Sequence, residues 1–314
     1  MTRHRSNLAA AAIVLIVVST LLLTTRLGVW VFLDLLGSLD EQPLPLDASA
    51  GPVSSPPFAG PIASLEMPPG IEQPSGITFD PQTRTWAIST DQAELFVLDE
   101  SMTRVLSRRL LLRTPPLFRQ GQIEAVAFVP GARTADDRLA FIGEIGKIQM
   151  WRRLAGDSPE WESAASISLP GELAELEASA LAFDPSAGKF FIASTDSSIL
   201  YLVNPNGSIA RRLDLEASDR WPPGALEPGR RVDELRISGL SLADGYLWAV
   251  TENYTTLLQL DPRSGNVVGL QSLPKLGEAS DLALVEGKAV FTLDHNWNDP
   301  RPTFRRIDLL TGSG

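Results

Sequence analysis

Polar and apolar residues alternate in a short phrase that recurs five times along the chain. Most copies read as a polar residue, a small residue and an alternating apolar run that ends in a turn. The copies are Ser75–Pro81, Glu124–Pro130, Ser179–Pro185, Ser238–Gly245 and Ser280–Gly287. An alternation of period two predicts a half-buried strand that enters a tight turn.

Further strands are predicted after each copy. Second strands lie at 86–90, 140–143, 191–195, 247–251 and 290–293, and they end before Asp91, Glu144, Asp196, Glu252 and Asp294. Third strands are predicted at Glu94–Leu98, Lys147–Arg152, Ile199–Val203, Thr256–Leu260 and Phe304–Leu309, and fourth strands at Arg104–Leu111, Ala165–Leu169, Ser208–Leu213 and Val267–Leu273. Units of four antiparallel strands that start roughly 40 to 60 residues apart predict an all-β propeller.

The fifth unit has no fourth strand, because the chain ends at Gly314. The stretch Ala63–Met67 is a spare strand, and it would close the ring by pairing with Phe304–Leu309. We therefore expect a five-bladed β-propeller over residues 62–314. Six blades are the alternative, since Glu216–Leu235 has no assigned strand.

The N-terminal segment has the features of a membrane anchor. Leu8–Thr25 carries no charge and would form a helix about 27 Å long, near the lower limit for crossing a bilayer. Arg3 and Arg5 precede it and predict a cytoplasmic N-terminus. Residues 1–36 are therefore a predicted single-pass membrane anchor, 37–61 a proline-rich linker and the propeller extracytoplasmic. A cleaved signal peptide is the alternative, although no small-x-small cleavage site follows the apolar run.

Composition excludes some functions. The net charge of −11 argues against nucleic acid as a partner, because binding to phosphates requires a basic face. The chain has no cysteine, which excludes disulfides and thiolate chemistry. Carboxylates and two histidines, His4 and His295, are the remaining metal ligands.

The repeated phrase resembles that of a known family. Gln73–Pro81, Ile123–Phe128, and the strand ends Ser89-Thr90-Asp91 and Val250-Thr251-Glu252 are similar to the SdiA-regulated family of membrane-anchored bacterial β-propellers. The resemblance implies a propeller fold and an envelope location over Ile71 to about Asp308. It implies no established reaction or substrate.

Topology places a candidate site at one mouth of the propeller. The start of each innermost strand and the end of the second strand lie on the same face, so five polar starts and five acidic ends should gather there. We expect ligand-binding roles for Glu124, Glu177, Arg236, Glu278 and His295, and metal-binding roles for Glu124, Glu144, Asp91, Asp196, Glu252 and Asp294. Rings of carboxylates suit calcium or magnesium. The alternative for each acid is a turn residue that accepts backbone N–H bonds.

Two functions follow from this site. The first is a binding module that presents one face to a small ligand or an envelope protein, with a divalent cation at the channel mouth. The second is a metal-dependent hydrolase of the lactonase, esterase or phosphoesterase type. Binding is favoured because two histidines and no cysteine do not assemble a convincing nucleophile–base pair.

Overall fold

A computed structural model describes residues 63–111, 123–131, 136–143, 146–154, 158–176, 178–195, 197–222, 235–273, 276, 279–293 and 303–308. The chain divides into two compact units, Met1–Gln42 and Pro43–Gly314, and every described residue belongs to the second. The predicted anchor Leu8–Thr25 and the linker 37–61 lie outside the described residues. In the described ranges, no helix has the length and apolar character needed to span a bilayer.

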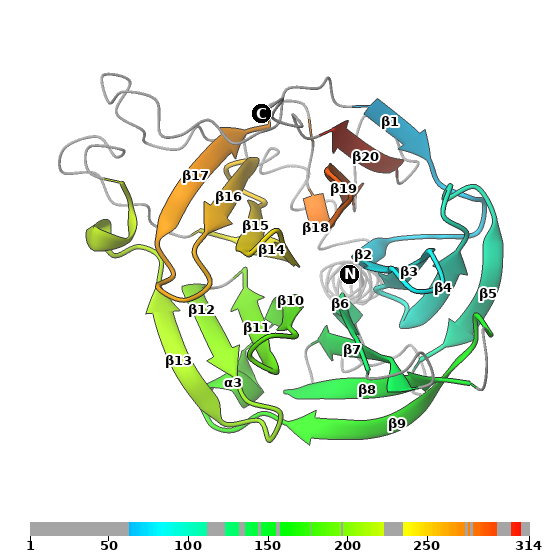
Figure 1. Ribbon diagram of the computed structural model, residues 1–314, viewed down its shortest axis with the longest axis horizontal. Coiled ribbons are helices and arrows are strands. Elements are labelled where there is room, and N and C mark those ends of the chain that lie inside the picture. The colour runs from blue at the N-terminus through cyan, green and yellow to red at the C-terminus, as the bar shows by residue number, and fades with distance from the viewer. Residues whose placement is uncertain are drawn as a thin grey trace, which may run out of the picture. The chain divides into compact units, whose positions relative to one another are not determined.

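The described residues form five four-stranded antiparallel sheets around a common centre (Figure 1). Blade 1 holds β2 (Pro74–Asp80), β3 (Thr85–Thr90), β4 (Glu94–Leu98) and β5 (Val105–Leu110); blade 2 holds β6 (Ile123–Val129), β7 (Arg138–Gly143), β8 (Lys147–Arg153) and β9 (Trp161–Ser168). Blade 3 holds β10 (Ala178–Asp184), β11 (Lys189–Ser194), β12 (Ser197–Val203) and β13 (Ile209–Asp214); blade 4 holds β14 (Ile237–Ala243), β15 (Tyr246–Thr251), β16 (Thr256–Leu260) and β17 (Val267–Ser272). Blade 5 holds β18 (Ala279–Val285), β19 (Lys288–Leu293), β20 (Thr303–Asp308) and β1 (Ala63–Glu66).

The five-bladed prediction is confirmed, and so is the closure of the ring by the first strand. β1 pairs antiparallel with β20, with Leu65 opposite Phe304. Ala63 lies at the end of β1 that is opposite Arg306, near the turn between β18 and β19. The chain therefore enters blade 5 on the face where the inner strands end, which we call the turn face. The opposite face, where the inner strands start, is the strand-start face.

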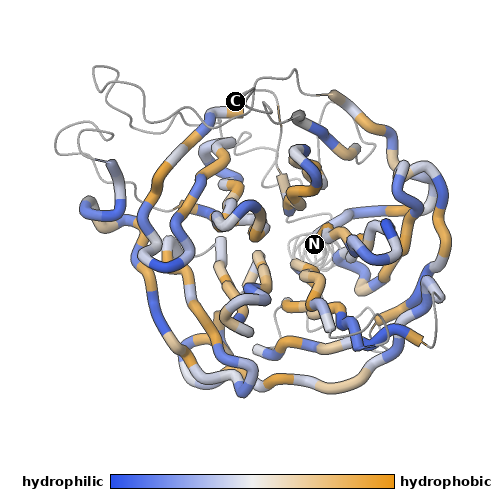
Figure 2. Tube along the Cα trace, in the orientation of Figure 1, coloured by the Kyte–Doolittle hydropathy of each residue, from blue (hydrophilic) through white to orange (hydrophobic). Residues whose placement is uncertain are grey.

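An apolar cluster fills the space between each pair of neighbouring blades. Each of the five clusters draws its buried residues from two adjacent blades, including the pair formed by blades 5 and 1. Apolar and polar residues alternate along many strands (Figure 2), and the outer strand β5 ends in three exposed residues. The period-two pattern thus places one apolar surface against each neighbouring blade, and this packing holds the ring together.

Two elements differ from the sequence prediction by more than two residues. β9 starts at Trp161 rather than Ala165, because Trp161 is buried and lies 4.4 Å from the Arg153 guanidinium, measured to the ring centre. The short helix α3 (Glu172–Glu175) was not predicted. Four residues are too few to show a helical period in the sequence, and only Leu173 of this helix is buried.

The inner strands share one irregularity that sequence reasoning did not identify. In every inner strand the pairing register shifts at the first residue of the phrase, so this residue forms a β-bulge. We number the phrase from this residue. Position 1 is Ser75, Glu124, Ser179, Ser238 or Ser280; position 2 is Gly76, Ala125, Ala180, Gly239 or Asp281. Positions 3, 4 and 5 follow in the same order along each strand.

Candidate functional site

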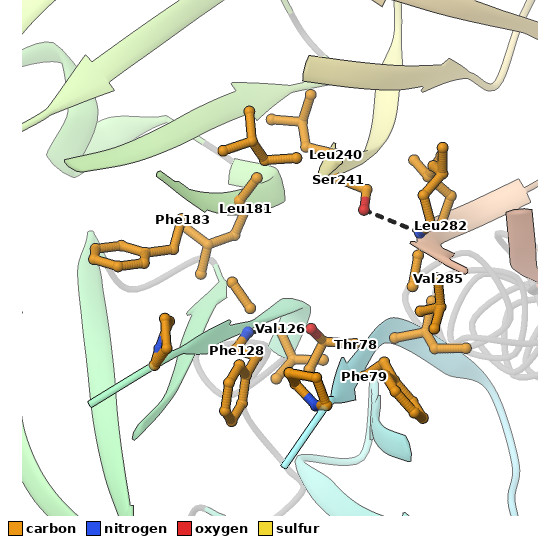
Figure 3. A pocket seen from close by; sticks show the side chains of 18 of the residues that line it. Thr78, Phe79, Val126, Phe128, Leu181, Phe183, Leu240, Ser241, Leu282 and Val285 are labelled. Carbon is orange, nitrogen blue, oxygen red and sulfur yellow. Dashed lines mark hydrogen bonds between the residues drawn. The ribbon is translucent and has the colours of Figure 1, made fainter. Parts of the chain in front are cut away.

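A cavity of about 390 Å³ opens at the centre of the turn face (Figure 3). Its wall consists of positions 3 to 5 of all five inner strands, together with Val285 at the end of β18 and the residues Pro81, Pro130, Pro185 and Glu286 that follow inner strands. Position 3 is buried in every blade and forms the deep part. Position 5 lies nearer the mouth and is Phe79, Phe128, Phe183, Leu242 or Leu284. The cavity is therefore a largely apolar funnel within the size range of small-ligand pockets.

The aromatic residues at the mouth are held by the second strands. Phe79 is opposite Trp86 in the sheet, and the two ring centres are 4.8 Å apart. Phe183 is opposite Phe190 at 5.0 Å. Tilted aromatic pairs of this kind stabilise one orientation of each ring. The mouth is consequently shaped before any ligand arrives.

Asp281 joins the inner strands of three blades next to the deep part of the funnel. It occupies position 2 of blade 5, where the other blades have glycine or alanine, and it is fully buried. Its Oδ2 accepts a hydrogen bond from the Ile77 N–H at 2.9 Å, and its Oδ1 accepts one from the Leu282 N–H at 2.8 Å. The Leu240 N–H also donates to this carboxyl group. A side chain that reaches the inner strands of blades 4, 5 and 1 must lie at the centre of the ring.

Space for this carboxyl group comes from Gly239. A Cβ atom at residue 239 would lie 2.6 Å from Asp281 Oδ1 and 2.6 Å from its Cα. Burial raises the pKa of Asp281 well above its ordinary value, and the three backbone hydrogen bonds oppose that rise. The inner strands of blades 4, 5 and 1 are therefore joined by a buried carboxyl group with backbone partners.

Two hydroxyl groups supply polar contacts in the funnel wall. Thr78 Oγ1 accepts the N–H of Phe128 from the next blade at 3.1 Å, and Ser241 Oγ accepts the N–H of Leu284 at 3.1 Å. Both hydroxyl groups occupy position 4 and are drawn in Figure 3. The other three blades carry Ala127, Ala182 and Ala283 at this position. The wall thus has polar groups on two sides, in blades 1 and 4.

The rim of the funnel carries one ion pair. Among the described wall residues, Glu286 alone has an ionisable side chain. Arg84 Nη1 lies 2.7 Å from Glu286 Oε1. Arg84 also lies 2.5 Å from Glu100 Oε1. The hydrogen bond from Arg84 lowers the pKa of Glu286, so this carboxylate is ionised and paired at neutral pH.

The strand-start face has the predicted arrangement where the chain is described. The Asp91 N–H donates to the Gln73 carbonyl at 3.1 Å, and the Glu252 N–H donates to the Arg236 carbonyl at 2.9 Å. The end of the second strand therefore lies beside the start of the first in blades 1 and 4. Glu124 lies in β6 of blade 2 and is half-buried. The predicted residues Glu144, Glu177, Asp196, Glu278, Asp294 and His295 lie outside the described residues.

Serines at position 1 link neighbouring blades on this face. Ser179 Oγ donates to the Ile237 carbonyl and Ser280 Oγ to the Pro74 carbonyl, both at 2.7 Å, and Ser75 makes the same bond to Ile123. Glu124 stands in this ring where three other blades use a hydroxyl donor. Glu124 therefore brings a carboxyl group to a place where these blades have a serine hydroxyl group. No cluster of three or more His, Asp or Glu side chains suited to a metal occurs in the described parts of the chain, and the calcium or magnesium site stays a prediction.

A buried charged cluster lies between blades 1 and 2. Arg153 forms an ion pair with Asp80, and neither side chain is more than 3% exposed. Asp137 is fully buried beside them and accepts hydrogen bonds from Gly131 N–H at 2.9 Å and Gln82 Nε2 at 3.2 Å. Burial raises the pKa of Asp137. The cluster is closed to solvent, so its role is to join the two blades rather than to contact a ligand.

Comparisons with known proteins place the chain by fold only. The chain matches no family model and no curated protein. Glutaminyl cyclase of Myxococcus xanthus is similar in structure, with 18% identity and a TM-score of 0.53 over 81% of this chain and 99% of that chain. The PQQ-bound aldose sugar dehydrogenase from Streptomyces coelicolor has 12% identity and a TM-score of 0.50 over 81% and 99%. The structural similarity shows a shared β-propeller fold and, at these identities, nothing more specific. Membership of the SdiA-regulated family stays a prediction.

Proposed function

We propose that this chain is a binding propeller whose turn-face funnel takes an apolar group of its ligand. The observation that carries this proposal is the funnel itself, a preformed cavity of about 390 Å³ at the centre of the ring. Pockets of this size with apolar walls and a few polar groups are the usual small-ligand sites of proteins. This site is on the face opposite the predicted acidic mouth.

Binding is favoured over hydrolysis by the chemistry of the wall. Among the described wall residues, the hydroxyl groups of Thr78 and Ser241 each accept a backbone N–H. The carboxylate of Glu286 is paired with Arg84. A nucleophile needs an adjacent base to be activated. The wall offers a shape and hydrogen bonds, which are what a binding site requires.

A neutral fluorescent probe tests this proposal. N-phenyl-1-naphthylamine should bind the propeller domain and gain fluorescence in the funnel. Leu242→Trp and Phe183→Trp, which narrow the mouth from two blades, should each weaken binding about tenfold or more. The matched control is Leu110→Ser, because Leu110 is 55% exposed on the outer strand β5 and offers the probe another apolar contact. Binding that is lost in Leu110→Ser and kept in both tryptophan variants would contradict the proposal.

We further propose that the domain is tethered to the outer side of the inner membrane. The support is the uncharged segment Leu8–Thr25 after Arg3 and Arg5, and the proline-rich linker before Ala63. β1 starts at the turn face, so the linker joins the domain on the face that holds the funnel.

The proposed tether predicts on which side of the membrane a reporter fused to the linker will lie. An alkaline-phosphatase-type reporter fused after Pro61 should be active, because the basic N-terminus keeps the preceding end in the cytoplasm. The membrane fraction should retain the fusion after a high-salt wash. Activity of only a cytoplasmic reporter at the same site, or a mature N-terminus near Arg26, would overturn the tether.

A further inference from the structure

The largely apolar funnel wall also contains hydrogen-bond donors, which are backbone N–H groups of the inner strands. In blades 2 and 5 the position-5 N–H points away from its own sheet and meets a hydroxyl group of the preceding blade. All five inner strands pair with their second strands in the same register from position 2 onward. The N–H groups of Phe79, Phe183 and Leu242 must therefore point the same way.

These three N–H groups face a different neighbour. The preceding blade presents Ala283 to Phe79, Ala127 to Phe183 and Ala182 to Leu242, where a hydroxyl group stands in the other two blades. A methyl group cannot accept a hydrogen bond. Thr78 and Ser241 each use their hydroxyl oxygen as an acceptor. The hydroxyl proton of each residue can still donate a hydrogen bond to a ligand. The wall thus offers donors to a ligand from several directions.

Charge limits what these donors can bind. Among the described wall residues there is no lysine, arginine or histidine, and the carboxylate of Glu286 is paired with Arg84. A carboxylate or phosphate in the funnel would lose its hydration without gaining a cation. A cation would find no free carboxylate among the described wall residues, since Glu286 is already paired with Arg84. The inner-strand carbonyl groups that point the same way as the N–H groups would also repel an anion.

The geometry points to a neutral ligand with an apolar body and a hydrogen-bond acceptor such as a carbonyl oxygen. This inference rests on the proposed function and names the ligand class of the same funnel. The apolar body lies against Phe79, Phe128 and Phe183. The carbonyl oxygen accepts a hydrogen bond from a position-4 hydroxyl group or an inward N–H group. Binding of this kind is non-covalent, and an unpaired polar group of the ligand would lower affinity.

Four naphthalene probes that share one ring system test the ligand class. They are 2-acetylnaphthalene, which is neutral with an acceptor, 2-ethylnaphthalene, which is neutral without one, the anion 2-naphthoate and the cation 2-naphthylmethylammonium. Each is titrated against the propeller domain, and displacement of N-phenyl-1-naphthylamine is measured. The acetyl probe should bind about 3–10-fold more tightly than the ethyl probe, in line with one hydrogen bond. Both charged probes should bind at least about tenfold more weakly than the acetyl probe.

A double variant locates the hydrogen bond. Thr78→Val with Ser241→Ala should reduce the preference for the acetyl probe over the ethyl probe and leave the ethyl affinity nearly unchanged. The matched control is Thr103→Val, which removes an exposed hydroxyl group at the Asp99 turn. If the double variant does not fold, the ranking of the four probes on the unmodified domain still decides the inference.

The outcomes separate the two proposals. If no probe binds and N-phenyl-1-naphthylamine does not bind either, the proposed function fails. If the naphthoate or the ammonium probe binds as tightly as the acetyl probe, the funnel binds ligands but the neutral class is wrong. Equal binding of the acetyl and ethyl probes would show that the ligand needs no hydrogen-bond acceptor. The proposal that the funnel binds an apolar group would still stand.

Discussion

A chain that starts at Pro68, and so lacks β1, should unfold at a temperature about 6–12 °C lower than a chain that starts at Ile62. The removed segment contributes the partly buried side chains of Leu65, in β1, and Met67, just after it, to the cluster between blades 5 and 1. Full burial of such a side chain stabilises by about 1.5–3 kcal/mol, so two partly buried ones together contribute about 3 kcal/mol. A loss of about 3 kcal/mol lowers the melting temperature of a domain of this size by this amount. β20 would also become an open edge that pairs with other molecules.

A rearranged chain is the control for this truncation. β20 runs toward the turn face and β1 starts there, so residues 62–67 placed after Gly314 through a short flexible linker can form a hairpin with β20. This variant has the strand in a new place in the sequence and should recover most of the lost stability. Calorimetry and light scattering measure both effects. An unchanged melting temperature and a monomeric state for the chain that starts at Pro68 would show that the ring does not depend on β1.

Asp281→Ala should destabilise the domain by about 3–5 kcal/mol. Three backbone N–H groups in blades 4, 5 and 1 lose their acceptor, and each unpaired buried group costs about 1–3 kcal/mol. The matched control is Asp281→Asn, which keeps the size and one acceptor oxygen. Urea unfolding at several pH values measures both variants. A loss below about 1 kcal/mol in Asp281→Ala would mean that the axial hydrogen bonds are dispensable.

The pH dependence gives this prediction a definite sign. The folded-state pKa of Asp281 is raised above its unfolded value, so the folded state binds this proton more tightly. Its contribution to stability is full below the unfolded pKa of about 3.9 and is lost as pH rises through the folded pKa. The free energy of unfolding of the natural chain minus that of Asp281→Asn should therefore fall as pH rises. The difference cancels other groups, including Asp137, whose pKa is also raised. A difference that rises with pH would contradict this sign.

The architecture was predictable because it repeats. The alternation in each phrase gave all five inner strands, and β4 and β16 have the predicted bounds. The closing strand was also predictable, since a strand-like stretch before the first unit matched a missing strand in the last. Because the same strand pattern occurs in five units, each strand assignment is supported by the equivalent strands of the other units. A single error, such as the start of β9, therefore does not change the predicted ring.

The candidate site was less predictable because its determinants are exceptions to the repeat. Asp281 departs from the small residues at position 2, and a carboxylate in a packing position was the available signal. The phenylalanines at position 5 were visible in the sequence, but the alternation alone does not distinguish a residue at the funnel mouth from one between the blades. Arg153 lies 73 residues from its partner Asp80, and no local pattern connects them. Sequence periodicity reports which face of a strand is buried, and it does not report which end of the channel is open.

The closing strand also orders events during synthesis. β1 is made among the first residues of the domain, and its partner β20 is made among the last. The ring therefore cannot close while the chain is still growing, and blades 1 to 4 can form earlier because their strands are consecutive in the sequence. We expect closure to be the late, slow step, because it joins the two most distant segments of the domain. Until then, β1 and the edge of β20 lack their pairing partner, so this interval is the one in which the domain exposes unpaired strand edges.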